Sequence, residues 1–171
     1  MPGTLVFTEH EVRTNIVRAV ADVFKTMLNR RVMLLPDNAP PAPVRYPPVR
    51  QIVGTVGIAG EANGVVYLRF SEPFARRCAG DMLRLTEREV SEMGDETVSD
   101  AVAELTNMVA GSFKNWLCDS GLSCKLSIPA TVCGTDFTIC ALQSGGESHH
   151  TYRFESSGQS IVVDVIVKIG G

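Results

Sequence analysis

The sequence has 171 residues, a mass of 18.5 kDa, 44% hydrophobic residues and 20% charged residues, which is the composition of a globular protein rather than of a disordered chain. This length suffices for a substantial core, so we expect residues 1–171 to form a single domain. The net charge of −3 and the pI near 5.6 disfavour nucleic-acid binding, which usually requires a basic excess.

No apolar run approaches the roughly 20 residues of a membrane span. The first ten residues lack a basic segment followed by an apolar one, so we expect no signal peptide and a cytoplasmic location. The cysteines are odd in number and form no Cys-x-x-Cys: Cys78, Cys118, Cys124, Cys133 and Cys140. This pattern fits a reduced chain with mostly buried thiols.

A metal site is the alternative for the cysteines, and it would combine some of them with His149 or His150. The spacings match no zinc pattern. We therefore expect the two histidines in a loop, and no metal or cofactor bound by this chain.

The first predicted element is a long helix. Thr8 and Glu11 have the spacing of a capping box, and apolar residues then recur at helical spacing to about Asn29.

A short apolar run at 32–35 predicts a strand. Residues 36–50 hold six of the nine prolines and predict an extended surface loop, because proline lacks an amide N–H and clashes with a preceding helical turn. A proline-rich ligand for another domain is the alternative, although the spacing is loose.

Residues 51–59 and 64–70 predict a hairpin whose second strand points Val66, Leu68 and Phe70 into the core. Gly54 and Gly57 in its first strand indicate a bulge or a close packing contact.

Ser71 is a suitable N-cap for a helix that runs to about Leu83, with Arg76 and Arg77 on its solvated surface. Thr86 and Glu89 form a second capping box before Gly94.

The central helix begins with an acidic run at Asp95 and stops at Gly121, a residue that tolerates the left-handed conformation of helix ends. Its apolar stripe consists of Val98, Val102, Leu105, Val109, Phe113 and Trp116. The opposite stripe consists of Asp100, Glu104, Asn107, Gly111 and Lys114. Asparagine and glycine are unfavourable inside helices, which suggests that something approaches this second stripe closely.

The chain after Leu122 has the character of β-structure. Pro129 suits the edge or start of a strand, residues 137–142 predict a further strand, and residues 152–155 and 161–169 predict a final hairpin. The element order predicts an α+β fold with long helices packed on one face of a largely antiparallel sheet.

Asp100, Glu104, Asn107 and Pro129 have the spacing Asp-x3-Glu-x2-Asn-x22-Pro. This motif resembles the signature of the CheC/CheX/FliY phosphatases of bacterial chemotaxis. The stretch Glu-Leu-Thr-Asn-Met-Val-Ala-Gly from Glu104 resembles the CheX branch, which carries the signature once. Consistently, the first helix has Val12, not glutamate, three residues before Asn15. The resemblance implies a CheX-like pseudo-symmetric fold.

The resemblance also implies a function, the hydrolysis of the aspartyl phosphate of a CheY-type response regulator. Asn107 would orient the attacking water and Glu104 would contact the regulator's active-site lysine. Asp100 would be peripheral, Gly111 would permit close approach, and Pro129 would support the helix.

Magnesium is expected in the regulator rather than in this chain, and a homodimer that pairs through sheet edges is expected. The alternatives are a non-catalytic docking or adaptor domain of the same fold and a small-molecule sensor, for which the sequence carries no pocket signature.

Overall fold

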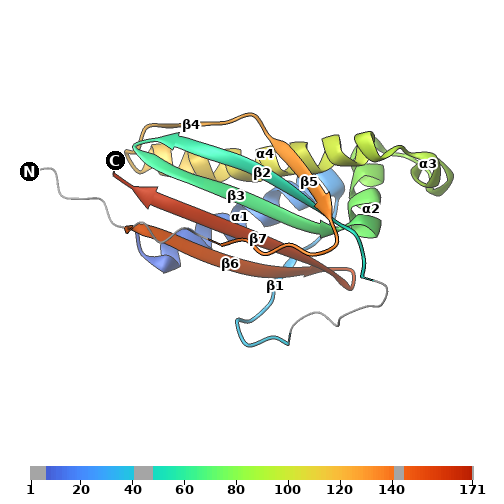
Figure 1. Ribbon diagram of the computed structural model, residues 1–171, viewed down its shortest axis with the longest axis horizontal. Helices are drawn as coiled ribbons and strands as arrows, with labels where there is room; N and C mark the ends of the chain where they lie inside the picture. Colours follow the sequence, from blue (N-terminus) through green and yellow to red (C-terminus); the bar gives the residue numbers. More distant parts are fainter. Residues whose placement is uncertain (1–6, 41–47, 141–144, 171) are drawn as a thin grey trace, which may run out of the picture.

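The computed structural model describes residues 7–40, 48–140 and 145–170, which form one seven-stranded sheet with the two long helices on one of its faces (Figure 1). In chain order the elements are α1 (Glu9–Leu28), β1 (Met33–Leu34), β2 (Gln51–Gly60), β3 (Ala62–Ser71), α2 (Glu72–Leu83), α3 (Glu87–Glu92), α4 (Asp95–Asp119), β4 (Cys124–Leu126), β5 (Ala130–Gly134), β6 (Glu147–Ser156) and β7 (Gln159–Ile169). All strand pairs are antiparallel, so the predicted α+β class is confirmed.

The sheet has the order β1-β6-β7-β3-β2-β4, with β5 also paired to β2. Each half of the chain is a long helix, a strand at the sheet edge and a hairpin. The edge strand of the first half, β1, pairs with β6 of the second half, whereas β4 and β5 of the second half pair with β2 of the first. The hairpins meet where β3 pairs with β7, in a register centred on Val66 and Val165. This reciprocal pairing is the pseudo-symmetry that the resemblance implied.

Helix α1 begins and ends where the local sequence predicts. The Thr8 hydroxyl accepts from the Glu11 amide at 3.2 Å, and the Glu11 carboxylate accepts from the Thr8 amide at 2.8 Å. Asn29 ends the helix in the left-handed conformation, with φ 51°. One face of the helix is buried in the core through Val12, Ile16, Ala19, Val20, Val23, Phe24 and Leu28.

The hairpins also follow the predicted alternation. Val66, Leu68 and Phe70 are buried, and the shared core joins them to the helices. The second hairpin turns at Ser157 and Gly158, whose positive φ values of 51° and 76° are those of a two-residue turn that matches the twist of the strands.

The predicted strand at 137–142 is wrong over residues 137–140, which have no regular structure; residues 141 and 142 lie outside the described residues. The β2 edge is already occupied by β5, and the next strand, β6, lies beyond β7 and β3. Residues 137–140 therefore run across the face of the sheet that carries no helix (Figure 1). Arg69 Nη1 on that face donates to the Phe137 carbonyl at 3.2 Å, so the crossing segment is held against the sheet.

The loop predicted for His149 and His150 is also wrong, because both residues lie within β6 and pair with Ile166 and Val165. The side chain of His149 has a partner that sequence could not reveal, the buried Asp164 on β7, with Nε2 at 2.9 Å from Oδ1. Thr151 Oγ1 donates to the same carboxylate oxygen at 2.6 Å. A buried carboxylate requires such partners, and the pairing of β6 with β7 places His149 and Thr151 beside Asp164.

Three smaller predictions have mixed outcomes. Helix α2 starts after Ser71, but the serine hydroxyl makes no capping hydrogen bond. The capping box of Thr86 and Glu89 is present at the start of α3. Residues 36–40 and 48–50 of the predicted proline-rich loop contain no helix or strand, and residues 41–47 lie outside the described residues.

Candidate active site on helix α4

Helix α4 carries the predicted motif, and its C-terminal end is fixed by glycine. Gly121 has φ 97°; its amide donates to the Cys118 carbonyl at 2.9 Å and the Leu122 amide donates to the Leu117 carbonyl at 3.0 Å. This pair of bonds satisfies carbonyls that the helix end leaves without partners. The predicted stop at Gly121 is therefore confirmed.

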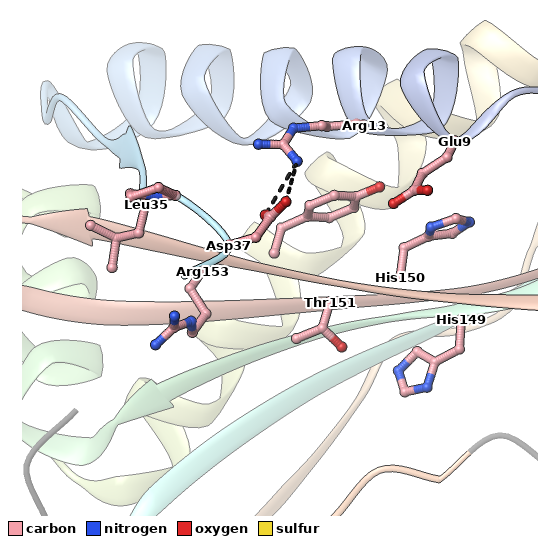
Figure 2. Close-up of a pocket in the computed structure, with 10 residues that line it drawn as sticks. Glu9, Arg13, Leu35, Asp37, His149, His150, Thr151 and Arg153 are labelled. Atoms are coloured by element: carbon pink, nitrogen blue, oxygen red, sulfur yellow. Dashed lines mark hydrogen bonds and ion pairs between the residues drawn. The ribbon is translucent and has the colours of Figure 1, made fainter. Parts of the chain in front are cut away.

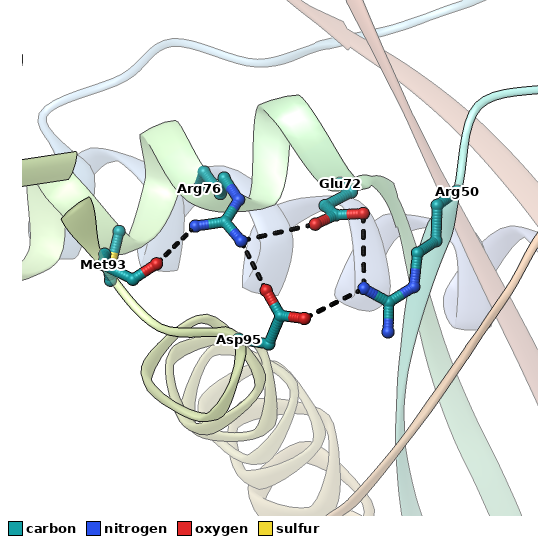
Figure 3. A network of polar contacts seen from close by, with 5 residues as sticks. All are labelled: Arg50, Glu72, Arg76, Met93 and Asp95. Atoms are coloured by element: carbon teal, nitrogen blue, oxygen red, sulfur yellow. Dashed lines mark hydrogen bonds and ion pairs between the residues drawn. The ribbon is translucent and has the colours of Figure 1, made fainter. Parts of the chain in front are cut away.

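The start of α4 is fixed by a network of charges (Figure 3). Asp95, the first helical residue, accepts from Arg76 of α2 and pairs with Arg50, 3.2 Å away, at the entrance to β2. Glu72 of α2 contacts both arginines, at 3.4 and 3.5 Å. Arg76 also donates to the Met93 carbonyl at 2.6 Å. The carboxylates of Asp95 and Glu72 raise the pKa of Arg50.

The interpretation of Arg76 as solvated surface is thus wrong, whereas Arg77 is exposed. The i,i+4 spacing of Glu72 and Arg76 was the available signal for this ion pair.

The buried face of α4 packs closely on β2. A methyl group at Gly54 would lie 1.9 Å from Thr106 Oγ1 and 2.9 Å from its Cβ, so only glycine permits this distance between helix and sheet. Thr106 is fully buried, and its hydroxyl donates to the Val102 carbonyl at 2.7 Å. Of the two interpretations of Gly54, close packing is the correct one.

The predicted apolar stripe of α4 is buried except for Trp116. This side chain is half-buried and covers the edge of the core, where its ring centroid lies 5.2 Å from that of Phe113 and 4.5 Å from that of Phe7.

The opposite stripe of α4 faces away from the core. Asp100 and Glu104 are exposed, and Asn107 and Gly111 are half-buried. Within the described part of the chain, the side chains of Asp100, Glu104 and Asn107 form no hydrogen bond or ion pair. A carboxylate and a carboxamide one turn apart are therefore both available to a partner molecule.

Gly111 lies beside β4, where a methyl group on it would meet Leu126 Cδ1 at 3.8 Å, an ordinary contact. The packing of this chain does not itself require glycine at this position. Pro129 is half-buried and directly precedes β5, which fits the predicted strand start.

Ser127 fixes the segment between β4 and β5, a role that the sequence analysis did not identify. Its amide donates to the Gly57 carbonyl at 2.8 Å, and its Oγ accepts from the Gly57 amide at the same distance. Gly57 therefore marks a close contact with the segment that leads to Pro129.

A separate cavity of about 340 Å³ lies between α1, residues 35–37 and β6 (Figure 2). Arg13 and Asp37 form an ion pair across it at 3.2 Å, and Glu9 and His150 lie close together at one end. Burial raises the pKa of Tyr152, which also lines the cavity, to about 12, so its phenol is protonated at neutral pH. No residue of the motif lines this cavity.

Among residues 7–40, 48–140 and 145–170, no group of three or more histidine, cysteine or acidic side chains is placed to hold a metal ion. No helix in the same residues is long and apolar enough to cross a bilayer.

Comparison with known proteins gives a consistent result. The family model of the chemotaxis phosphatase CheX matches residues 52–155. No curated protein matches the chain significantly. A CheC-like protein from Shewanella sp. PV-4 shares 25% identity over 94% of this chain and 99% of its own, with a TM-score of 0.71.

Two further structures share the fold. CheX from Vibrio vulnificus is 22% identical over 95% of this chain and 100% of its own, with a TM-score of 0.73. CheX from Borrelia burgdorferi, in a complex with CheY, BeF3 and Mg²⁺, is 19% identical over 92% of this chain and 97% of its own, with a TM-score of 0.63. Because the family model matches more than half of the sequence, this chain belongs to the CheX family of chemotaxis phosphatases.

Proposed function

We propose that this protein hydrolyses the aspartyl phosphate of a CheY-type response regulator, with Glu104 and Asn107 as the residues that enter the regulator's active site. The observation that carries the proposal is the carboxamide of Asn107, which has no hydrogen-bond partner among the described residues and lies one turn from the exposed Glu104, on a helix that is fixed at both ends. The complex of a Borrelia CheX with CheY supports the choice of partner.

An aspartyl phosphate already has a good leaving group, so the catalyst's work is to position water and to stabilise charge. A carboxamide suits both tasks. The Oδ1 atom of Asn107 accepts a hydrogen bond from the attacking water, and its Nδ2 donates to a phosphoryl oxygen. This role is similar to that of the glutamine that orients water in GTPases.

Glu104 has a different role in this proposal. Its carboxylate pairs with the lysine of the regulator's active site and sets the orientation of the two proteins. Because Glu104 and Asn107 are three residues apart, one rigid helix delivers both side chains together. Magnesium belongs to the regulator's own carboxylates, where it neutralises the phosphoryl oxygens.

The test is phosphate release from a phosphorylated receiver protein in the presence of Mg²⁺. Wild-type protein is expected to accelerate release, whereas Glu104→Ala and Asn107→Ala are expected to lose most of this acceleration, with unchanged circular dichroism. Retained activity in folded Asn107→Ala would overturn the assignment of that residue. Receiver binding without acceleration by the wild type would instead indicate the non-catalytic docking domain.

We also propose that the protein is a homodimer that pairs through the β6 edge. Among the described residues, β1 and Leu35 cover only the end of β6, at Arg153, Phe154 and Glu155, and an uncovered strand edge favours pairing with a second copy. Light scattering should give a mass near 37 kDa, about twice the 18.5 kDa of one chain. A mass of one chain at all concentrations tested would reject the dimer.

A further inference from the structure

Two cysteines meet where α4 ends and β4 begins. The Sγ atoms of Cys118 and Cys124 are 3.8 Å apart, and Cys118 Sγ also lies 3.8 Å from the Cys124 carbonyl oxygen. Both thiols are free. A disulfide has an S–S length of about 2.05 Å, so small side-chain rotations would bring these atoms to bonding distance.

The backbone holds the two residues in this position. Cys118 is an acceptor in the hydrogen-bonded turn that ends α4. Cys124 pairs with Gly60 of β2, and next to it the Ser123 carbonyl accepts from the Glu61 amide at 2.9 Å. The Glu61 carboxylate in turn accepts from the Ser123 amide at 2.7 Å. The approach of the two sulfurs is therefore a property of the fold and not of one loop conformation.

The other three cysteines differ in placement. Cys78 is fully buried on α2, and burial raises the pKa of its thiol to about 12. Cys133 and Cys140 are exposed. Cys118 is half-buried and can meet a small reagent, whereas Cys124 is buried with its sulfur next to that of Cys118. This pair thus combines one accessible thiol with one internal thiol.

We propose that Cys118 and Cys124 form a reversible disulfide, a redox modification site that joins the end of α4 to β4. The oxidant is a low-molecular-weight disulfide such as oxidised glutathione. The Cys118 thiolate attacks one sulfur, forms a mixed disulfide and expels the other half as a thiolate. Cys124 then loses its proton to solvent and attacks Cys118 Sγ, which expels the second thiolate. Two protein thiols are oxidised, and one small disulfide is reduced to two thiols.

The second step has an expected pH dependence. Burial is the largest cause that raises the pKa of Cys124 to about 11; the hydrogen bond with Cys118 and the charges of Cys118 and Glu61 act in the same direction, and Lys114 opposes them. The thiolate is the nucleophile, and below this pKa its fraction rises tenfold for each pH unit. The rate at which Cys124 displaces glutathione from Cys118 should therefore rise by about tenfold for each pH unit between pH 7 and pH 9.

Peptide mapping tests the proposal directly. In a Cys133→Ser/Cys140→Ser background, trypsin cleavage after Lys114 and Lys125 places both cysteines in the single peptide 115–125. After incubation with oxidised glutathione, this peptide should be lighter by two hydrogens, and dithiothreitol should restore its mass. A stable glutathione adduct at Cys118, or no change, would overturn the proposal.

Two matched variants separate the steps. Cys124→Ser in the same background should stop at the glutathione adduct on Cys118, and Cys118→Ser should remain unmodified.

The same oxidation in urea provides the comparison with the unfolded chain. If the fold holds the sulfurs together, the equilibrium constant for forming the Cys118–Cys124 disulfide should be at least about tenfold larger in the folded protein than in the chain unfolded by urea. An equal or smaller constant would also overturn the proposal.

Discussion

Helices α1 and α4 occupy equivalent positions in the two halves of the fold, yet they use an asparagine on the outer face in opposite ways. On α1, Asn15 Nδ2 donates to the Glu11 carbonyl at 2.9 Å, and its Oδ1 accepts from Arg18 at 2.7 Å. On α4, the Asn107 carboxamide has no such partner among the described residues. The residue three before Asn15 is the buried Val12, whereas the residue three before Asn107 is the exposed Glu104.

This contrast shows that repetition of the architecture does not repeat the site. Both helices bury one face in the same core. Of these two helices, α4 aligns a carboxamide and a carboxylate that make no hydrogen bond or ion pair with any residue the structure describes. An internally satisfied asparagine cannot orient a water for a partner without losing its own hydrogen bonds.

The largest expected effect is the loss of catalysis in Asn107→Ala. Removal of a group that orients water and donates to the phosphoryl oxygen should slow receiver dephosphorylation by about 10²–10³-fold, or ~3–4 kcal/mol. The matched control is Asn15→Ala on the equivalent helix, which should keep the wild-type rate. Single-turnover phosphate release measures both variants, and an equal loss in both would break the comparison.

The next effect concerns the packing that positions α4 on the sheet. Gly54→Ala would place a methyl group against Thr106 and should lower the free energy of unfolding by about 2 kcal/mol through overpacking. Urea denaturation measures this loss. Adding Thr106→Ala removes the clashing hydroxyl, so the double variant should be more stable than the sum of the two single effects predicts. If the changes in the free energy of unfolding were strictly additive, the contact between residues 54 and 106 would not limit how closely α4 packs on β2.

A smaller effect is expected from Gly111→Ala. Glycine inside a helix costs about 1 kcal/mol relative to alanine, and the new methyl group meets only an ordinary contact with Leu126, so the variant should be more stable. If the receiver approaches this stripe closely, the same change should slow dephosphorylation. The neighbouring exposed Ser112→Ala is the control and should leave the rate unchanged. Full activity in Gly111→Ala would remove Gly111 from the proposed interface.

The smallest effect concerns the starts of the two helices. Helix α1 has a side-chain cap from Thr8, whereas α4 starts at Gly94 with no side-chain cap. Gly94 has φ −70°, and a methyl group there would meet nothing within 4 Å, so Gly94→Ser should fit without strain. It should raise the free energy of unfolding by a few tenths of a kcal/mol. A lower urea midpoint would show that the serine disturbs the Asp95 network.

Local sequence determined the features whose signals lie within a few residues. The capping boxes at Thr8 and Thr86, the glycine stop at Gly121 and the alternation of Val66, Leu68 and Phe70 on β3 all follow from short-range spacing. The alignment of Glu104 and Asn107 on one helix face has the same origin, because 3.6 residues per turn fixes it before any packing occurs. The motif and its family resemblance could therefore be identified from sequence.

Tertiary structure decided which segments pair and which polar groups remain free. Residues 137–140 are not a strand because β5 already occupies the β2 edge, and His149 lies in a strand because Asp164 from β7 is its partner. Similarly, Arg76 is part of a network because α4 starts beside α2. These contacts join residues that are far apart in the chain, so the availability of a sheet edge or of an opposite charge depends on the assembled fold and not on local propensity.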